Sequence, residues 1–305
     1  MGLEPHSAAV TPDISRQVGA WAERPVAGVV PDVNALTVDV EDYFHVEAFA
    51  GVIDRESWDR RECRIERNVD RILELFSDAG VQATFFTLGW VAERYPAMVR
   101  RIVAHGHELT SHGLTHHRAD SQTSAGFFQD VARSKCVLED IGGGEVKGYR
   151  AASFSINATN IWAYEMLERA GFRYSSSLYP ARYVREAPQF AFHPLSDSAF
   201  MEIPIASIRR FGLTWPCGGG GFFRLFPYGL SAMNMRLAAR RDKKPCVFYF
   251  HPWEIDPDQP RVPGASLKSR IRHYTNLGRM HSRLTRLLAD FRWNRLDRIY
   301  PALGS

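Results

Sequence analysis

Two histidines in the segment GHELTSHGLTHH, residues 106–117, have a type and spacing that indicate chemistry. His112 and His116 are four residues apart, so on a helix or tight turn their imidazoles point the same way. Two converging neutral imidazole nitrogens suit a divalent metal ion. The alternative is a pair of surface histidines that share a face and bind nothing. A metal site would need a third ligand, which we expect to be a carboxylate from another segment.

Other polar residues of catalytic type stand at the ends of predicted strands. They are Asp39, Glu41 and Asp42 after the run 34–40, Arg150 after VKGY, and His251 after VFYF. The predicted strands alternate with helices, which indicates a parallel sheet, either open or closed into a barrel. The carboxyl ends of parallel strands meet at one edge of the sheet. We therefore expect these residues and the histidine pair to form one site, although any single one could be structural.

Hydrophobic periodicity defines the elements that must position this site. Strands are predicted over 34–40, 81–89, 107–112, 172–177 and 244–254, and a strand followed by a loop over 146–156. Helices are predicted over 65–80, 96–106, 124–144, 157–171 and 266–291. Asn157 is the predicted N-cap of the fourth helix. The segment CGGGGFFR, 217–224, interrupts the pattern. It reads as a flexible loop or as a place where backbone approaches a ligand.

Length and composition are those of a folded α/β protein. The chain has 305 residues, 45% hydrophobic and 24% charged, with a formal net charge of +4. No apolar run is long enough to cross a membrane, and no secretory signal is visible near the start. Four widely spaced cysteines, Cys63, Cys136, Cys217 and Cys246, favour reduced thiols and a cytoplasmic location. Residues 1–33 are expected to form a flexible lead-in.

Six segments, taken in order, resemble the NodB-type polysaccharide deacetylases, carbohydrate esterase family 4. They are LTVDVEDYF, ATFFTLGWVAERYP, GHELTSHGLTHH, GYRAASFSI, FRYSSSLYP and FYFHPWE. Together with the GGGGFFR loop and RHYTNLGRM, the DVEDYF variant is similar to a subgroup found with bacterial exopolysaccharide and exosortase loci. The resemblance implies an α/β fold, a distorted (β/α)7 barrel over 34–260 with a helical C-terminal extension over 261–305.

The resemblance also implies roles for individual residues. His112 and His116 would bind the metal, Asp39 would be the catalytic base, His251 the acid, and Arg150 would orient the base. Ser153, Phe154 and Trp253 would contact substrate. The metal would be Zn²⁺, with Co²⁺ or Ni²⁺ as alternatives.

The third metal ligand is ambiguous because Val40 stands where the family has its metal-binding aspartate. Strand alternation puts Glu41 on the same side as Asp39, which favours Glu41. The family's use of aspartate favours Asp42, which is our preferred ligand.

Two further positions depart from the family. Ala152 replaces a proline, which predicts a less rigid loop. Ser175 replaces the aspartate beside the acid histidine, so the pKa of His251 would be lower than in relatives unless another carboxylate, such as Glu202, substitutes.

The implied function is a metal-dependent hydrolase that removes N-acetyl groups from a sugar of a polysaccharide or a lipid-linked glycan precursor. An N-acetylated glycan is then the partner, and no nucleic acid is expected. Two alternatives remain: an allantoinase-like cyclic amidase, and a degenerate barrel that binds carbohydrate without turnover.

The segment 261–305 carries ten Lys or Arg residues against two acids. The simplest interpretation is a helix packed on the barrel with a charged outer face. The alternative is that Arg283, Arg286, Arg292 and Arg295 dock on an anionic surface, such as the inner membrane or a lipid-linked glycan.

Overall fold

A computed structural model describes residues 26, 28–30, 32–180, 188–210, 212–242 and 244–303. Most of the expected lead-in over 1–33 lies outside the described residues. Among the described helices, none is long and apolar enough to span a bilayer.

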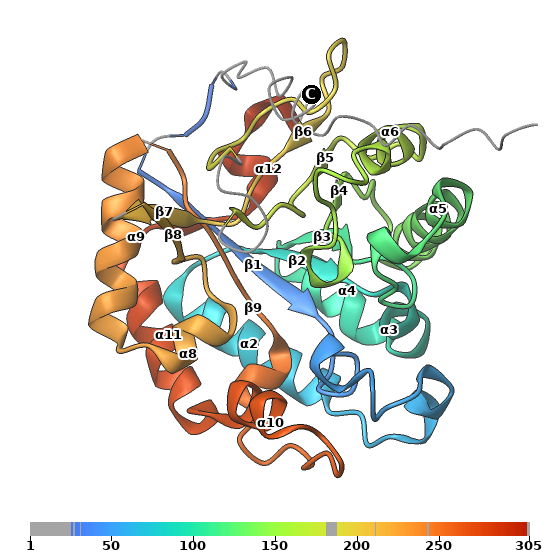
Figure 1. Ribbon diagram of the computed structural model, residues 1–305, viewed down its shortest axis with the longest axis vertical. Coiled ribbons are helices and arrows are strands. Elements are labelled where there is room, and N and C mark those ends of the chain that lie inside the picture. Colours follow the sequence, from blue (N-terminus) through green and yellow to red (C-terminus); the bar gives the residue numbers. More distant parts are fainter. Residues whose placement is uncertain are drawn as a thin grey trace, which may run out of the picture.

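A curled parallel sheet forms the centre of the molecule (Figure 1). Its strands are β1 (Asn34–Val40), β2 (Thr84–Thr87), β3 (Glu108–Ser111), β4 (Gly148–Tyr149), β5 (Tyr174–Ser175), β6 (Met201–Glu202), β9 (Val247–Phe250) and β10 (Trp293–Asn294). The sheet runs from β1 through β2, β3, β4 and β5 to β6, and β9 lies along β1. Val38 pairs with Phe85 of β2 and with Phe250 of β9. Strand β1 is therefore central and is buried along its whole length.

Helices surround the sheet, as the alternating sequence pattern predicts (Figure 1). They are α2 (Ile65–Ala79), α3 (Gly89–Arg94), α4 (Pro96–Ala104), α5 (Ser124–Gly142), α6 (Trp162–Arg169), α8 (Gly220–Leu225), α9 (Tyr228–Asp242), α10 (Leu267–Tyr274), α11 (Leu277–Asp290) and α12 (Leu296–Ile299). In α2 the stripe containing Val69, Ile72 and Phe76 is fully buried. Gly80 ends α2 in the left-handed conformation, with φ 62°.

Two helix predictions are wrong in detail. Helix α6 begins at Trp162, and Asn157 does not cap it. Instead, the Asn157 side chain accepts a hydrogen bond from the Thr159 backbone in a preceding turn. The helix predicted over 266–291 is divided into α10 and α11, because Asn276 between them adopts a left-handed φ of 59°.

The glycine run contacts the chain's own backbone at β9 and leads into α8, so it is not a freely flexible loop. Gly218 O accepts a hydrogen bond from Tyr249 N of β9 at 2.8 Å. At Gly219, with φ 105°, a Cβ atom would lie 2.0 Å from Tyr249 O. Glycine is needed here because β9 and this segment touch through their main chains.

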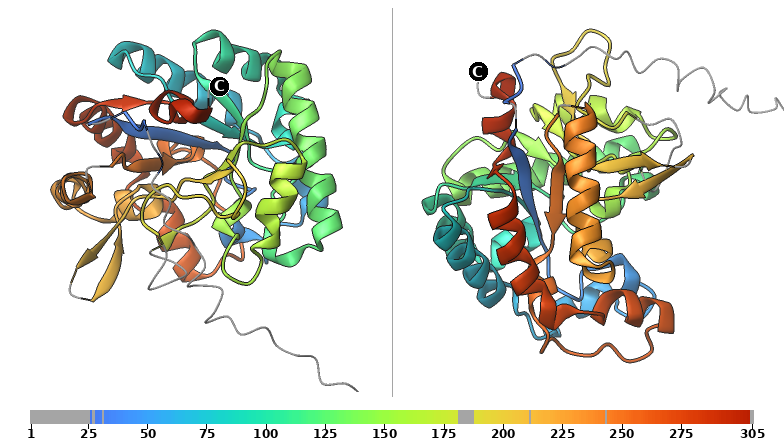
Figure 2. Two further views of the ribbon diagram at one scale, coloured as in Figure 1. Left: turned by 90° about the horizontal axis from the view of Figure 1, so that it is seen from above. Right: turned by 90° about the vertical axis from the view of Figure 1, so that its left-hand side faces the viewer.

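The C-terminal segment is integrated into the barrel. Strand β10 pairs with Asn34 and Ala35 at the start of β1. The antiparallel hairpin of β7 (Ser207–Arg210) and β8 (Leu213–Pro216), in contrast, projects from the body of the molecule (Figure 2).

Candidate metal centre and acid–base site

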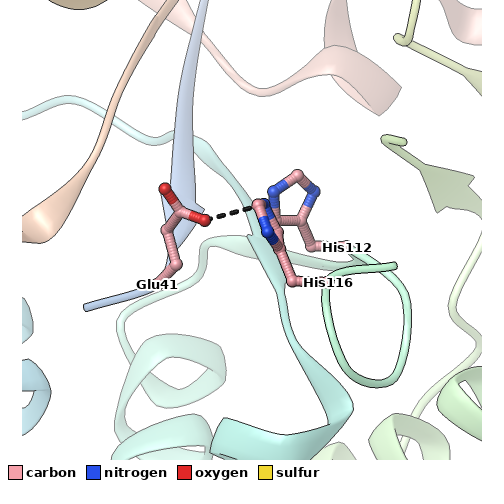
Figure 3. Close-up of side chains that lie close together, drawn as sticks. All are labelled: Glu41, His112 and His116. Atoms are coloured by element: carbon pink, nitrogen blue, oxygen red, sulfur yellow. Dashed lines mark ion pairs between the residues drawn. The ribbon is translucent and has the colours of Figure 1, made fainter. Parts of the chain in front are cut away.

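Three side chains from two strand ends form a buried cluster (Figure 3). Glu41 follows β1, and His112 and His116 follow β3. Their candidate ligand atoms all lie within 4.8 Å of one another. Glu41 Oε2 is 2.9 Å from His116 Nε2, yet Glu41 Oε2 has no hydrogen-bond partner among the described residues. The three candidate ligand atoms converge instead of forming a well-directed hydrogen bond, which is the arrangement expected of cation ligands.

The chain fixes the orientation of both histidines. His112 Nδ1 lies 2.9 Å from the Arg150 carbonyl oxygen, so the protonated Nδ1 donates and Nε2 keeps its lone pair. Burial is the main cause that lowers the pKa of His112 to about 4, which keeps the ring neutral. His116 sits in the left-handed region at φ 56°, an uncommon conformation for a residue other than glycine.

The preference for Asp42 as the third ligand is corrected by the geometry. Asp42 is buried, but its carboxylate accepts hydrogen bonds from the backbone N–H groups of Tyr43, at 2.7 Å, and Arg64. Burial raises the pKa of Asp42 to about 6. Glu41 has the opposite character: burial alone would raise its pKa, but His116, His251 and His112 outweigh burial and hold the pKa well below its ordinary value. Glu41 is therefore the carboxylate that the structure brings to the histidines.

Asp39 and Arg150 form a fully buried ion pair beside this cluster. Arg150 donates to Asp39 Oδ1 at 2.6 Å and to the Thr37 hydroxyl at 2.8 Å. It also donates to the carbonyl and the hydroxyl of Ser176, and its guanidinium lies 4.0 Å from the Phe86 ring centroid. One oxygen of Asp39 is thus held firmly, and the other faces His251 Nε2 at 3.9 Å.

His251 ends β9 and is held from behind by a carboxylate. Its Nδ1 lies 2.7 Å from Glu254 Oε1, and its Nε2 points to Glu41 Oε1 at 3.5 Å. Burial alone would lower the pKa of His251, but the hydrogen bond to Glu254 and the charges of Glu41 and Asp39 raise it above its ordinary value. His251 is 17% exposed, whereas Asp39 and Glu41 are 2% and 3% exposed, so His251 is the most accessible group of the three.

Glu254 is in turn paired with Arg224, which comes from the glycine-rich segment. Arg224 Nε lies 2.5 Å from Glu254 Oε2, and both residues are buried. Burial alone would raise the pKa of Glu254, but Arg224 and His251 lower it to about 2. The remaining Arg224 N–H groups donate to the carbonyls of Arg272, His273 and Thr275.

Sequence reasoning missed Glu254 and Arg224 and named the wrong substitute for the absent aspartate. Ser175 donates to the Ser177 hydroxyl at 2.7 Å. Glu202 Oε1 accepts from the backbone N–H groups of Ser177 and Leu178, so Glu202 supports a loop and not His251. The spacing within HPWE could have predicted Glu254 as the partner of His251, because it places Glu254 three residues and one short turn after His251.

The loop after Arg150 contains two of the expected substrate contacts. Ser153 and Phe154 both have φ of 54°, and Phe154 is buried beside Tyr179 and Tyr249. The Ala151 N–H already donates to the Ser177 hydroxyl at 2.8 Å, so it does not point to an open oxyanion position. The greater loop mobility expected from Ala152 stays a prediction.

Trp253, the third expected substrate contact, lies next to the acid histidine. Its ring stacks on His251 at 5.1 Å and on His273 at 4.1 Å, and only 5% of it is exposed. Trp253 supports the orientation of His251, and contact with substrate stays a prediction for all three residues.

Residues 57–175 match the family model described as polysaccharide deacetylase, and residues 176–301 match a domain of unknown function. A peptidoglycan deacetylase of Helicobacter pylori is 31% identical over 114 residues, 37% of this chain and 38% of the relative. Residues 57–175 therefore carry a polysaccharide deacetylase domain of the NodB type. Its placement in the exosortase-associated subgroup stays a prediction.

Other relatives agree with this family. A chitooligosaccharide deacetylase of Sinorhizobium fredii is 42% identical over 45 residues, which are 15% of this chain and 21% of that protein. The chain therefore aligns with well under half the length of these curated relatives. A solved structure from Mycobacterium smegmatis, described as a candidate polysaccharide deacetylase, superposes with a TM-score of 0.56 at 18% identity over 91% of this chain and 95% of that one. This likeness shows the fold, a distorted (β/α)7 barrel.

Proposed function

We propose that the protein is a metal-dependent hydrolase that removes acetyl groups from an N-acetylated glycan. The observation that carries the proposal is the grouping of two acid–base candidates, Asp39 and His251, around the cluster of Glu41, His112 and His116. The names of the matched relatives support an N-acetylated sugar polymer as the substrate class.

Glu41, His112 and His116 are the residues that would hold the cation. One carboxylate and two neutral imidazoles are a donor set that suits Zn²⁺ and its neighbours in the transition series. A divalent cation bound there would supply Lewis acidity to the acetyl carbonyl and to a water molecule.

The chain's own residues then move the protons. Asp39, whose Oδ1 is occupied by Arg150, can accept the proton of the attacking water at Oδ2. His251 can donate the proton at Nε2 to the leaving nitrogen, because Glu254 holds Nδ1 on the opposite side of the ring. Water is consumed, the amide C–N bond breaks, and acetate and an amine are the products.

Acetate release from N-acetylglucosamine oligomers, measured with metal-depleted and metal-reloaded protein, tests the proposal. We expect His112→Ala and His116→Ala to lose bound metal and acetate release together. Asp39→Asn should keep the metal and lose about 10²–10⁴ in rate, because only a proton acceptor is removed. Full metal retention in both histidine variants would refute this ligand assignment.

The same assay separates the alternative functions. Ring opening of a cyclic amide without acetate release would indicate the cyclic amidase. Glycan binding without any turnover in the metal-loaded protein would indicate the degenerate barrel.

A further inference from the structure

Exposed apolar side chains are concentrated in one part of the chain. Of the ten large hydrophobic residues that are exposed among the described residues, nine lie between Leu213 and Ile271. Within each element they recur at a spacing that places them on one side: Leu213 and Trp215, Phe222 and Leu225, Leu230, Met233 and Leu237, and Leu267 and Ile271. Exposed apolar residues grouped in this way mark an interaction surface more often than scattered ones do.

The elements that carry these residues are neighbours in space. Helix α9 packs against β7 of the hairpin, and α8 packs against α10. Arg224 of α8 joins the last pair by donating to the carbonyl oxygens of Arg272 and His273. Figure 2 shows α9 with the hairpin on one side and α10 beyond its far end. We call the exposed residues of β8, α8, α9 and α10 the β8–α10 surface.

The same part of the chain has an unbalanced charge. Residues 205–240 and 259–289 contain no aspartate or glutamate, and they carry five and seven Lys or Arg residues respectively. Arg240 of α9 and Lys268 and Arg270 of α10 are exposed among the apolar side chains. A second copy of this chain would bring like charges together, which disfavours self-association through this surface.

We propose that the β8–α10 surface docks the protein on an anionic phospholipid bilayer. Basic residues placed between apolar ones are typical of segments that lie in the interface of a membrane, and Trp215 has the side chain that this region favours. A fluid bilayer can receive apolar groups from several separate elements without a matching rigid shape. The anionic headgroups supply the negative charge that this surface lacks.

This assignment moves the docking face from the four arginines named above to α10 and the elements beside it, and it leaves out Arg283 and Arg295 for a structural reason. Arg283 donates to the backbone carbonyls of Phe223, Arg224 and Phe226, and Arg295 donates to the Gly106 carbonyl and pairs with Asp297. Both arginines therefore hold the fold together.

Flotation of the full chain with vesicles tests the proposal. We expect recovery with phosphatidylcholine–phosphatidylglycerol vesicles and little recovery with pure phosphatidylcholine. Each basic residue near an anionic surface contributes about fivefold to partitioning, so the variant Arg240→Gln, Lys268→Gln, Arg270→Gln should bind about a hundredfold more weakly. The variant Trp215→Ser, Met233→Ser, Leu267→Ser should also lose binding.

A matched control removes three positive charges elsewhere. Arg100→Gln, Arg133→Gln, Arg169→Gln changes exposed residues of α4, α5 and α6, outside the β8–α10 surface, and should bind as the parent does. Figure 1 shows α5 and α6 across the molecule from α9. Circular dichroism confirms that all variants are folded. Equal recovery with and without anionic lipid, or an unaffected charge variant, would overturn the proposal. The proposal would also be overturned if the parent protein dimerised without binding vesicles and the apolar variant were a monomer.

Discussion

At the scale of single residues, the site depends on which carboxylate oxygen is left without a partner. Both oxygens of Asp42 accept hydrogen bonds from backbone N–H groups, whereas Glu41 Oε2, which lies beside His116, has no hydrogen-bond partner among the residues that the structure describes. Adjacent residues in the sequence thus have different roles, one holding the turn after β1 and the other facing the histidines.

The pair Glu41→Gln and Asp42→Asn tests this difference through metal binding alone. Removal of a ligand should weaken Zn²⁺ binding by at least about a hundredfold, since loss of an outer partner already costs 10–100-fold. We expect that loss in Glu41→Gln and near-normal affinity in folded Asp42→Asn, measured by titration calorimetry. The reverse order would restore Asp42 as the ligand.

Glu254 is the residue that positions His251. Glu254→Gln keeps the size of the side chain but removes the charge that stabilises the protonated imidazole, so kcat should fall about 10–100-fold with little change in KM. Glu254→Asp should recover part of kcat. Ser175→Asp should change little, because Ser175 is bonded to Ser177 and not to His251. A strong gain in Ser175→Asp would contradict this view.

At the scale of elements, the sheet is joined to α8 by a backbone contact that only glycine permits. Gly219 has φ 105°, and any Cβ there would collide with Tyr249 O of β9. The contact sets where α8 begins and so where Arg224 meets Glu254. Packing of β9 and the orientation of His251 are thereby linked.

Gly219→Ala should therefore lower the free energy of unfolding by roughly 2–4 kcal/mol, from backbone strain and overpacking together. Gly229→Ala is the control: it lies in α9, and a Cβ there meets nothing within 4 Å. It should stabilise by about 0.5–1 kcal/mol. Urea unfolding measures the free energy of unfolding of both variants. Similar values would show that the backbone adjusts to a Cβ atom at position 219 without loss of stability.

At the scale of the whole molecule, the amino ends of the strands are joined through one buried carboxyl group. Glu108 of β3 accepts hydrogen bonds from Thr84 of β2 and Tyr174 of β5, and its Oε2 lies 3.4 Å from the Asp297 N–H of α12. Burial, followed by the nearby charge of Asp297, raises the pKa of Glu108 to about 7. Folding therefore favours the protonated form of Glu108.

The sign of the resulting pH dependence follows from this raised pKa. The folded state binds the proton of Glu108 more tightly than the unfolded chain does. The contribution of this proton to folding stability is therefore complete below about pH 4.5 and is lost as pH rises through about 7. Glu108→Gln, which stays neutral, should match the parent near pH 5 and exceed it near pH 8 by no more than about 3 kcal/mol. Urea unfolding at both pH values measures the free energy of unfolding of Glu108→Gln and of the parent. If the two proteins differed by the same amount at both pH values, the raised pKa of Glu108 would be contradicted.

The sequence by itself determined the alternation of β1 to β5 and β9 with their main helices, and the residues that lie at those strand ends, whereas β6, β7, β8 and β10 were not predicted. Asp39, His112, Arg150 and His251 could be predicted because side chains that follow parallel strands must meet at one edge. The histidine spacing predicted a candidate metal site, because it depends on neighbouring residues of one segment. These features depend on periodicity and on short spacings, which the chain carries in each segment separately.

Only the tertiary structure decided between Glu41 and Asp42 and brought Arg224 to Glu254, the carboxylate that holds His251. The Asp42 oxygens are taken up in part by Arg64, 22 residues away, and Glu254 pairs with Arg224 across 30 residues. The C-terminal segment also joins the sheet through β10, which pairs with Asn34 at the opposite end of the chain. Contacts of this kind form only when distant segments pack together. A buried carboxylate needs hydrogen-bond partners, and the carboxylate that packing leaves without them remains available to a cation.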